Sequence, residues 1–146
     1  MSKLEPIRWS DAMLTGVDEI DRQHRVLVNT LNEIIVCLPD QDDDELAERI
    51  TRDLLGYALY HFETEQGLML RSGYLRECAL DAASHLAQHR AFSERVESLR
   101  NGINRGLELD LEGLTRFLHD WLIGHIMNSD VRFGRFLRGE TVELKA

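Results

Sequence analysis

Helical spacing of apolar residues over four long stretches constrains the fold of this chain more than any other feature of its sequence. In each stretch, apolar residues or histidines recur every three or four positions, as from Ile20 through His24 and Leu27 to Leu31. This period places those side chains on one face of an α-helix. Strand-like alternation is nearly absent, so the sequence predicts an all-α protein. The four helices are expected at residues 18–38, 44–71, 81–105 and 110–128.

Short breaks separate the four predicted helices. Pro39 and the acidic run at residues 40–43 end the first helix, Gly73 follows the end of the second, and Gly106 ends the third. A loop is expected after Gly73, and Asp110 is expected to cap the fourth helix. Four helices of similar length with short connections most simply pack as an up-down-up-down four-helix bundle.

The bundle and its flanks are expected to form a single domain over residues 1–146, since a chain of this length normally forms one core. Residues 1–17 are expected to form an N-terminal arm in which Trp9 packs across the bundle. Beyond Asn128 the chain is expected to bend or to continue as a short C-terminal helix.

Composition and charge exclude several classes of protein. The 26 acidic and 17 basic residues give a net charge of −9, which argues against nucleic acid as a partner because phosphate binding needs a basic surface. No apolar run reaches the length of a membrane span, and the N-terminus lacks the apolar core of a secretory signal. Cys37 and Cys78 match no metal or redox spacing and are expected to be reduced thiols. We therefore expect a soluble cytoplasmic protein without membrane insertion.

The histidines carry the functional signal of the sequence. A single histidine on an apolar helix face is usually a hydrogen-bonded core residue, but five of the six histidines fall on such faces, together with one glutamate. Each buried imidazole needs a partner, and a shared metal centre satisfies them together. The five histidines and the glutamate are His24, His61, His85, His89, His125 and Glu65.

Local spacing supports the metal interpretation on two of the helices. His85 and His89 are four residues apart, which places both rings on one face of a helix and towards one ion. His61 and Glu65 have the same spacing. In contrast, His119 lies six residues before His125 and well off its face, so we expect it at the surface or outside the ligand set.

The second carboxylate is harder to identify from spacing. Asp130 follows His125 by five residues, which is about 140° around an ideal α-helix. Asp130 therefore needs a local distortion of the helix near Asn128 to reach the same centre. On spacing alone, Asp120 and Glu63 remain rival carboxylates.

The number of imidazoles predicts two metal ions. Five are too many for one tetrahedral zinc. If Glu65 and Asp130 bridge two ions and a solvent oxygen also bridges them, an ion with three histidines is six-coordinate. The other ion, with two histidines, keeps one open position for a small diatomic ligand. Mixed nitrogen and oxygen ligation with carboxylate bridges favours iron. Trp121 and Leu122, one turn before His125, are expected to form a wall of the open position.

At these residues the sequence resembles the hemerythrin family, most closely its bacterial single-domain members, over nearly the whole chain. The resemblance rests on Trp9, the segment from Gly16 to His24, His61-Phe62 followed by Glu65, His85-x-x-x-His89, Trp121-Leu122-x-x-His125-Ile126, and Asp130.

The resemblance implies a non-haem di-iron centre that binds dioxygen. His85, His89 and His125 would bind one iron, His24 and His61 the other, and Glu65 and Asp130 would bridge the two. The resemblance also selects Asp130, because the family uses this five-residue step. Gln66 stands where many relatives have a second glutamate, and it is expected to face away from the metals.

Reversible dioxygen binding for transport, storage or delivery is the leading hypothesis. The alternatives are an oxygen- or redox-sensing module of a signalling system, and a di-iron protein that handles peroxide or nitric oxide. No clear nucleophile, second acid–base pair or organic cofactor motif is present, so we do not expect an enzyme.

Overall fold

The computed structural model describes residues 4–37, 44–106 and 110–139, and over these ranges every regular element is helical. The predicted all-α fold is therefore confirmed. The elements are a 3-10 turn (Asp11–Met13), α1 (Asp18–Cys37), α2 (Asp44–Ser72), α3 (Tyr74–Glu77), α4 (Ala79–Asn104), α5 (Leu111–Gly124), a π-helical segment (His125–Asp130) and α6 (Val131–Leu137).

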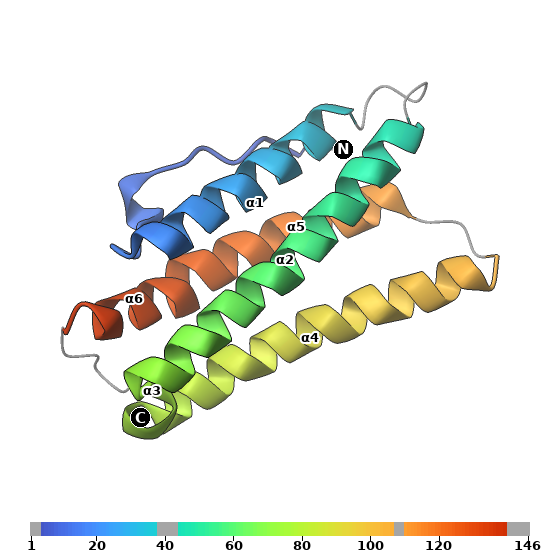
Figure 1. Ribbon diagram of the computed structural model, residues 1–146. Helices are drawn as coiled ribbons and strands as arrows, with labels where there is room; N and C mark the ends of the chain where they lie inside the picture. The colour runs from blue at the N-terminus through green and yellow to red at the C-terminus, as the bar shows by residue number, and fades with distance from the viewer. Residues whose placement is uncertain (1–3, 38–43, 107–109, 140–146) are drawn as a thin grey trace.

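Four long rods of helix form the bundle. Helices α1, α2 and α4 and the continuous rod of α5, the π-helical segment and α6 lie roughly parallel, and the chain reverses direction from each rod to the next (Figure 1). This is the expected up-down-up-down arrangement. Helix α1 packs along both α2 and α5, and α2 packs against α4.

The N-terminal arm is fixed to the bundle at both of its described ends. Ile7 is buried, and its backbone exchanges two hydrogen bonds with the Asn32 side chain of α1, at 2.7 and 2.9 Å. Trp9 packs against the main core as expected, with the Arg25 guanidinium 5.2 Å above its ring. The arm therefore closes one side of the bundle near α1.

The end of the arm is held between α1 and α6. The Thr15 backbone amide and hydroxyl both donate to Asp21 Oδ1, at 2.8 and 2.7 Å, and Arg138 donates to the Thr15 carbonyl at 2.7 Å. Gly134 of α6 allows this close approach, because a Cβ there would press on the Thr15 carbonyl and lie 2.7 Å from the Thr15 Cβ.

The sequence prediction of a loop after Gly73 was wrong, because a short helix forms there. Gly73 has a φ of +85° and ends α2, but the next residues form α3, and α4 begins at Ala79 instead of near Asp81. The turn forms because the amides of Arg76 and Glu77 donate to the Gly73 carbonyl. Four residues are too few for a helical period to show in the sequence.

The ends of the last helix also differ from expectation. Asp110 caps α5 as predicted, since its side chain accepts a hydrogen bond of 3.0 Å from the Gly113 amide. The α-helix ends at Gly124, not near residue 128, and continues as the π-helical segment and α6. The stop predicted at Pro39 and residues 40–43 lies outside the described residues.

The interior consists of two apolar clusters with a polar layer between them. The larger cluster includes Leu27, Phe62, Phe92 and Leu122, and the smaller comprises Ile20, Met69, Tyr74, Cys78, Ala82 and Phe133. Each rod contributes to both clusters, and each carries buried histidine or carboxylate side chains between its two contributions. The polar layer therefore crosses all four rods at one level.

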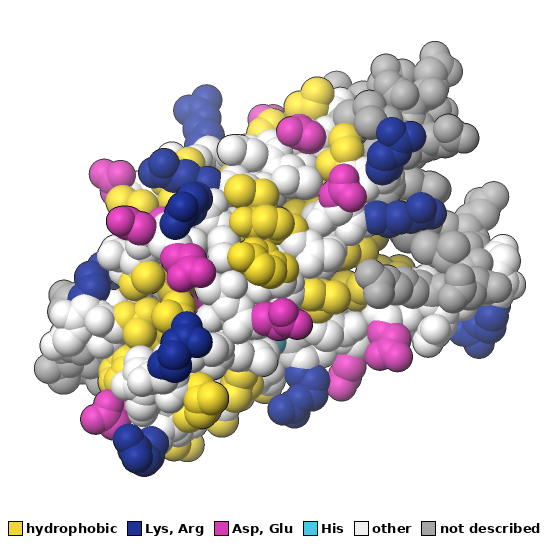
Figure 2. Space-filling view, in the orientation of Figure 1, with side chains coloured by type: hydrophobic (Ala, Val, Ile, Leu, Met, Phe, Trp, Pro, Cys, Tyr) yellow, Lys and Arg dark blue, Asp and Glu magenta, His cyan; other side chains and the backbone are white. Residues whose placement is uncertain are grey.

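Charged side chains of both signs are mixed on the face of the molecule that Figure 2 shows. They are interspersed among hydrophobic side chains, and hardly any histidine surface is visible. Within the described ranges, no helix has both the length and the hydrophobicity needed to cross a membrane. Cys78 is a free, buried thiol, whereas the Cys37 side chain lies outside the described part of the chain.

Candidate metal centre

The polar layer brings together all seven side chains that the sequence analysis singled out as metal ligands. Each is at most 3% exposed. Their potential ligand atoms form two groups, and within each group the atoms lie within 4.8 Å of one another. Both groups include the same two carboxylates. The groups are His85, His89, His125, Glu65 and Asp130, and His24, His61, Glu65 and Asp130.

Asp130 reaches the layer because the helix changes its winding. The distortion expected near Asn128 is the π-helical segment His125–Asp130. In a π-helix the hydrogen bonds join residues five apart, so His125 and Asp130 lie about one turn apart and on a common face. The Asn128 side chain donates to the Gly124 carbonyl at 2.8 Å, which satisfies an acceptor beside the distortion.

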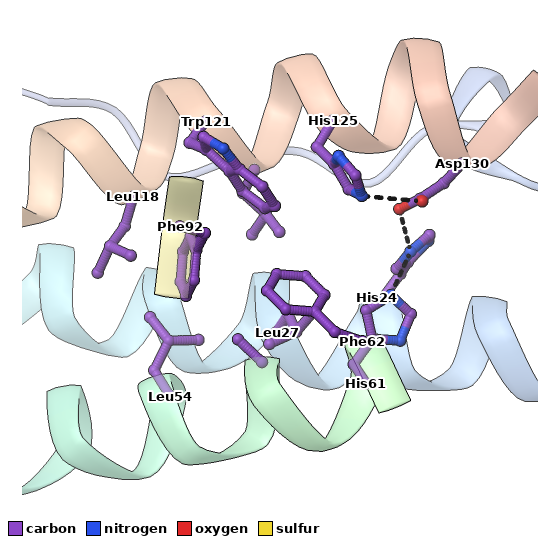
Figure 3. A pocket seen from close by; sticks show the side chains of 12 residues that line it. His24, Leu27, Leu54, His61, Phe62, Phe92, Leu118, Trp121, His125 and Asp130 are labelled. Atoms are coloured by element: carbon purple, nitrogen blue, oxygen red, sulfur yellow. Dashed lines mark hydrogen bonds and ion pairs between the residues drawn. The ribbon is translucent and has the colours of Figure 1, made fainter. Parts of the chain in front are cut away.

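The Asp130 carboxylate faces both groups of histidines. Its Oδ2 lies 2.7 Å from His24 Nε2, and its Oδ1 lies 2.9 Å from His85 Nε2 and 3.1 Å from His125 Nε2. Figure 3 shows Asp130 between His24 and His125, with its two oxygens directed to different rings. One oxygen for each group is the geometry of a bridging carboxylate.

Glu65 occupies the centre of the layer on α2. Its Oε1 lies 2.8 Å from His61 Nε2 and 3.5 Å from His89 Nε2, whereas its Oε2 lies 3.3 Å from His85 Nε2. Glu65 therefore also contacts both groups, although its Oε1 faces histidines of each.

The close contacts between the histidines and the two carboxylates are not aligned as hydrogen bonds. Both oxygens of Glu65, both oxygens of Asp130 and His85 Nε2 are buried without a hydrogen-bond partner, although nitrogens and oxygens approach to about 3 Å. Such atoms are costly to bury unless a further partner lies between them. Their convergence on shared points fits metal ions as that partner, so these residues are suited to form a metal centre.

Both carboxylates are held in the charged state that a cation requires. Burial by itself raises the pKa of Glu65, but the adjacent His61 and His85 more than offset this effect and lower the pKa well below its usual value. Asp130 shows the same balance, since burial and Glu65 raise its pKa while His125 and His24 lower it further.

The imidazoles differ in their readiness to bind a metal. Burial lowers the pKa of His89 to about 4, so this ring is neutral and its lone pair is free at neutral pH. Burial also lowers the pKa of His85, but Glu65 and Asp130 reverse the shift and raise it to about 10. In the metal-free protein His85 therefore carries a proton, which a metal must displace.

Two aromatic rings cover the histidines of the larger group. Phe62 stacks on His89 with ring centroids 4.0 Å apart, and Trp121 stacks on His125 at 4.5 Å, each with an interplanar angle of 14°. These rings fix the imidazole planes and keep water from their faces. The role of Phe62 was not predicted beyond its place in the family motif.

An apolar cavity leads from the layer into the main core. It begins at the cluster residues His24, His61, His125 and Asp130 and extends between the helices towards Leu54 (Figure 3). Its volume, about 10 Å³ for the centre of a water-sized molecule, is near the minimum that holds one water. Apart from the cluster residues, the lining consists of Leu27, Leu54, Ala58, Phe62, Phe92, Leu118, Trp121 and Leu122.

The two pocket residues expected from the sequence, Trp121 and Leu122, both line this cavity. The rival carboxylates Asp120 and Glu63 are exposed and belong to neither group of ligand atoms. His119 is also outside both groups, and its Nδ1 lies 3.0 Å from the carboxylate of the adjacent Asp120.

Three glutamines around the layer were not predicted to act on the site. Gln23 and Gln88 each contact an outer ring nitrogen of a histidine on another helix, at 2.6 and 2.7 Å. Gln66 is exposed as expected, with its Nε2 3.5 Å from His89 Nδ1. The available sequence signal was the dipeptide Gln-His, which occurs twice.

Comparisons with known proteins agree with this geometry. Residues 15–136 match the family model of the hemerythrin HHE cation binding domain. The chain is 31% identical to a bacteriohemerythrin of Pseudomonas aeruginosa over 138 residues, which cover 93% of this chain and 84% of that protein. It is 27% identical to a bacteriohemerythrin of Methylococcus capsulatus, with coverage of 86% and 92%.

A hemerythrin-like protein of Naegleria gruberi is 23% identical, over 88% of this chain and 91% of that protein. No solved structure gives a significant match. The family match spans the arm end, the four rods and the whole polar layer, and the chain therefore belongs to the hemerythrin family.

Proposed function

We propose that the polar layer holds a non-haem di-iron centre. His85, His89 and His125 bind one iron, His24 and His61 bind the other, and Glu65 and Asp130 bridge them. The two groups of converging ligand atoms and the two shared carboxylates support this assignment. Membership in a family of cation-binding domains supports it as well.

The cavity carries the functional part of the proposal. His24 and His61 would supply two histidine ligands to one iron and the larger group three to the other, so the smaller group has one protein ligand fewer. Both histidines of the smaller group, His24 and His61, line the apolar cavity, whereas of the larger group only His125 does. A ligand bound at the smaller group would therefore face a small apolar space, which suits a neutral diatomic molecule better than a polar substrate.

We propose that this chain binds dioxygen reversibly, for its transport, storage or delivery. The iron pair supplies the electrons that make dioxygen binding strong and reversible. The protein supplies the enclosure, because the hydrocarbon and aromatic lining excludes water and offers no acidic group beyond the cluster. This lining favours a binding protein over an enzyme.

A location in a reducing compartment such as the cytoplasm belongs to the same proposal. The free, buried thiol of Cys78 supports it, since thiols in oxidising compartments are commonly paired.

The test is a visible absorption series on the iron-loaded full chain, with the iron content determined first. The protein is reduced without oxygen, exposed to air and then purged with inert gas. We expect two irons per chain and a charge-transfer band that appears in air and fades on purging. Direct and irreversible oxidation in air would refute reversible binding and favour a redox sensor or a peroxide-handling protein.

A further inference from the structure

Gln23 connects the two helices that carry the smaller histidine group. It directly precedes His24 on α1 and is only 5% exposed. Its Oε1 accepts from His61 Nδ1 on α2 at 2.6 Å, and its Nε2 donates to Thr64 Oγ1 on the same helix at 3.2 Å. Both ends of the amide are therefore engaged by α2.

Gln88 occupies the corresponding place beside the larger group. It directly precedes His89 on α4, and its Oε1 accepts from His125 Nδ1 at 2.7 Å and from Ser129 Oγ at 2.9 Å. His125 and Ser129 both belong to the π-helical segment that also carries Asp130. Gln88 thus joins α4 to the segment whose distortion places the second carboxylate.

The two arrangements follow one rule. A glutamine stands before a ligand histidine, crosses to the neighbouring rod and binds the outer nitrogen of a histidine there. An amide oxygen can only accept, so the bonded Nδ1 of His61 and of His125 must carry the proton. When the ring is neutral, its inner Nε2 then has a free lone pair, and these nitrogens lie 3.1 Å from those of His24 and His89, respectively.

We propose that Gln23 and Gln88 are positioning residues, one for each iron of the proposed centre. Gln23 fixes the tautomer and orientation of His61, and Gln88 fixes those of His125, so that both rings are ready before a metal arrives. Partners of this kind commonly change metal affinity by roughly 10- to 100-fold when they are removed. The proposal rests on the two-metal centre of the preceding section, but its tautomer component does not require metal.

Gln66 provides a matched control on the same layer. It also lies beside a ligand histidine, but its side chain is exposed and its contact with His89 Nδ1 is at the 3.5 Å limit. Water can replace such a contact, so its loss should change metal binding little.

The first experiment is an anaerobic titration of the metal-free full chain with ferrous iron. Gln23→Met and Gln88→Met keep the side-chain length but remove the acceptor, and each should weaken one of two binding steps by roughly 10- to 100-fold. Gln23→Glu and Gln88→Glu restore an acceptor and should restore affinity. Gln66→Met should bind like the unchanged protein.

If iron affinity falls equally in the Met and Glu variants, the glutamines act only through packing and the proposal is wrong. Unchanged iron affinity in both Met variants would also overturn it. A single binding step in the unchanged chain would contradict the two-metal centre instead.

Nitrogen-15 NMR of the histidine rings in the metal-free chain then tests the glutamines by themselves. The proposal requires the Nδ1–H tautomer at His61 and His125, lost at His61 in Gln23→Met and at His125 in Gln88→Met. The Nε2–H tautomer at both rings in the unchanged chain would refute it.

Discussion

Replacing Leu122 with asparagine tests whether the cavity wall protects the proposed oxygen site. Leu122 is 8% exposed and lines the cavity beside the cluster. Burying its side chain stabilises the fold by about 1.5–3 kcal/mol, and an incompletely bonded amide in its place costs a further 1–3 kcal/mol or so. The loss of about 2.5–6 kcal/mol is smaller than the stability of many domains, which reaches about 15 kcal/mol, and should lower Tm by roughly 8–18 °C.

Leu122→Asn should accelerate autoxidation of the oxygenated protein by more than its loss of folding stability would explain. The asparagine amide gives a water molecule a polar partner inside a cavity that is otherwise apolar away from the cluster. In autoxidation the departing oxygen carries negative charge. A hydrogen bond from that water to this charge stabilises the departing group by about 1.5–3 kcal/mol. At 1.36 kcal/mol for each factor of ten, autoxidation should accelerate roughly tenfold to a hundredfold.

The assay is the decay of the oxygenated visible band at fixed temperature and pH, with Leu114→Asn as the matched control. Leu114 lies on the same helix and is 3% exposed, but it does not line the cavity. It should lose similar stability and keep the rate of the unchanged protein. Equal acceleration in both variants would show that instability alone causes oxidation, and no acceleration at Leu122 would refute its protective role.

Three further predictions concern metal content, packing and pH. His85→Ala should reduce bound iron below two per chain by metal analysis, and a full complement would contradict its role as a ligand. Gly134→Ala should lower Tm by several degrees, because overpacking against Thr15 costs about 1–3 kcal/mol, whereas Gly56→Ala, with nothing within 4 Å, should raise it slightly. In the metal-free protein, Glu65 and Asp130 outweigh burial and raise the pKa of His85 from 6.5 to about 10. This contribution to the free energy of unfolding is complete below pH 6.5 and disappears as the pH rises through 10, so urea denaturation should show a decline over that range that His85→Gln makes smaller.

The long helices could be predicted from the sequence because their buried faces are long and regular. Helix α1 begins at the predicted residue 18, and α2 ends within one residue of the prediction. Helix α3 could not be predicted, since it has four residues and its hydrogen bonds depend on the positive φ of Gly73. Its burial of Tyr74 against Phe133 depends on a contact between distant parts of the chain.

The histidines of the site could be predicted from the sequence alone, whereas one carboxylate and the neighbouring glutamines could not. Histidines four apart on one helix face need no tertiary information to be grouped. Asp130 needed the family resemblance, because a π-helical segment is set by packing and side-chain contacts such as that of Asn128 with Gly124. Gln23 and Gln88 were missed because their partners lie on other helices, 37 or more residues away in the sequence.

The polar layer also determines how the protein can fail. Every rod passes through the layer, so ions bound there would fasten four helices and join two apolar clusters that are otherwise separated by charged and polar groups. Metal binding then becomes part of the folding free energy, as for any ligand held only by the native state. Without metal, the chain would loosen across its full width and become accessible to proteases. Metal occupancy of the proposed centre would thereby govern how well the whole bundle resists proteolysis, as well as what it binds.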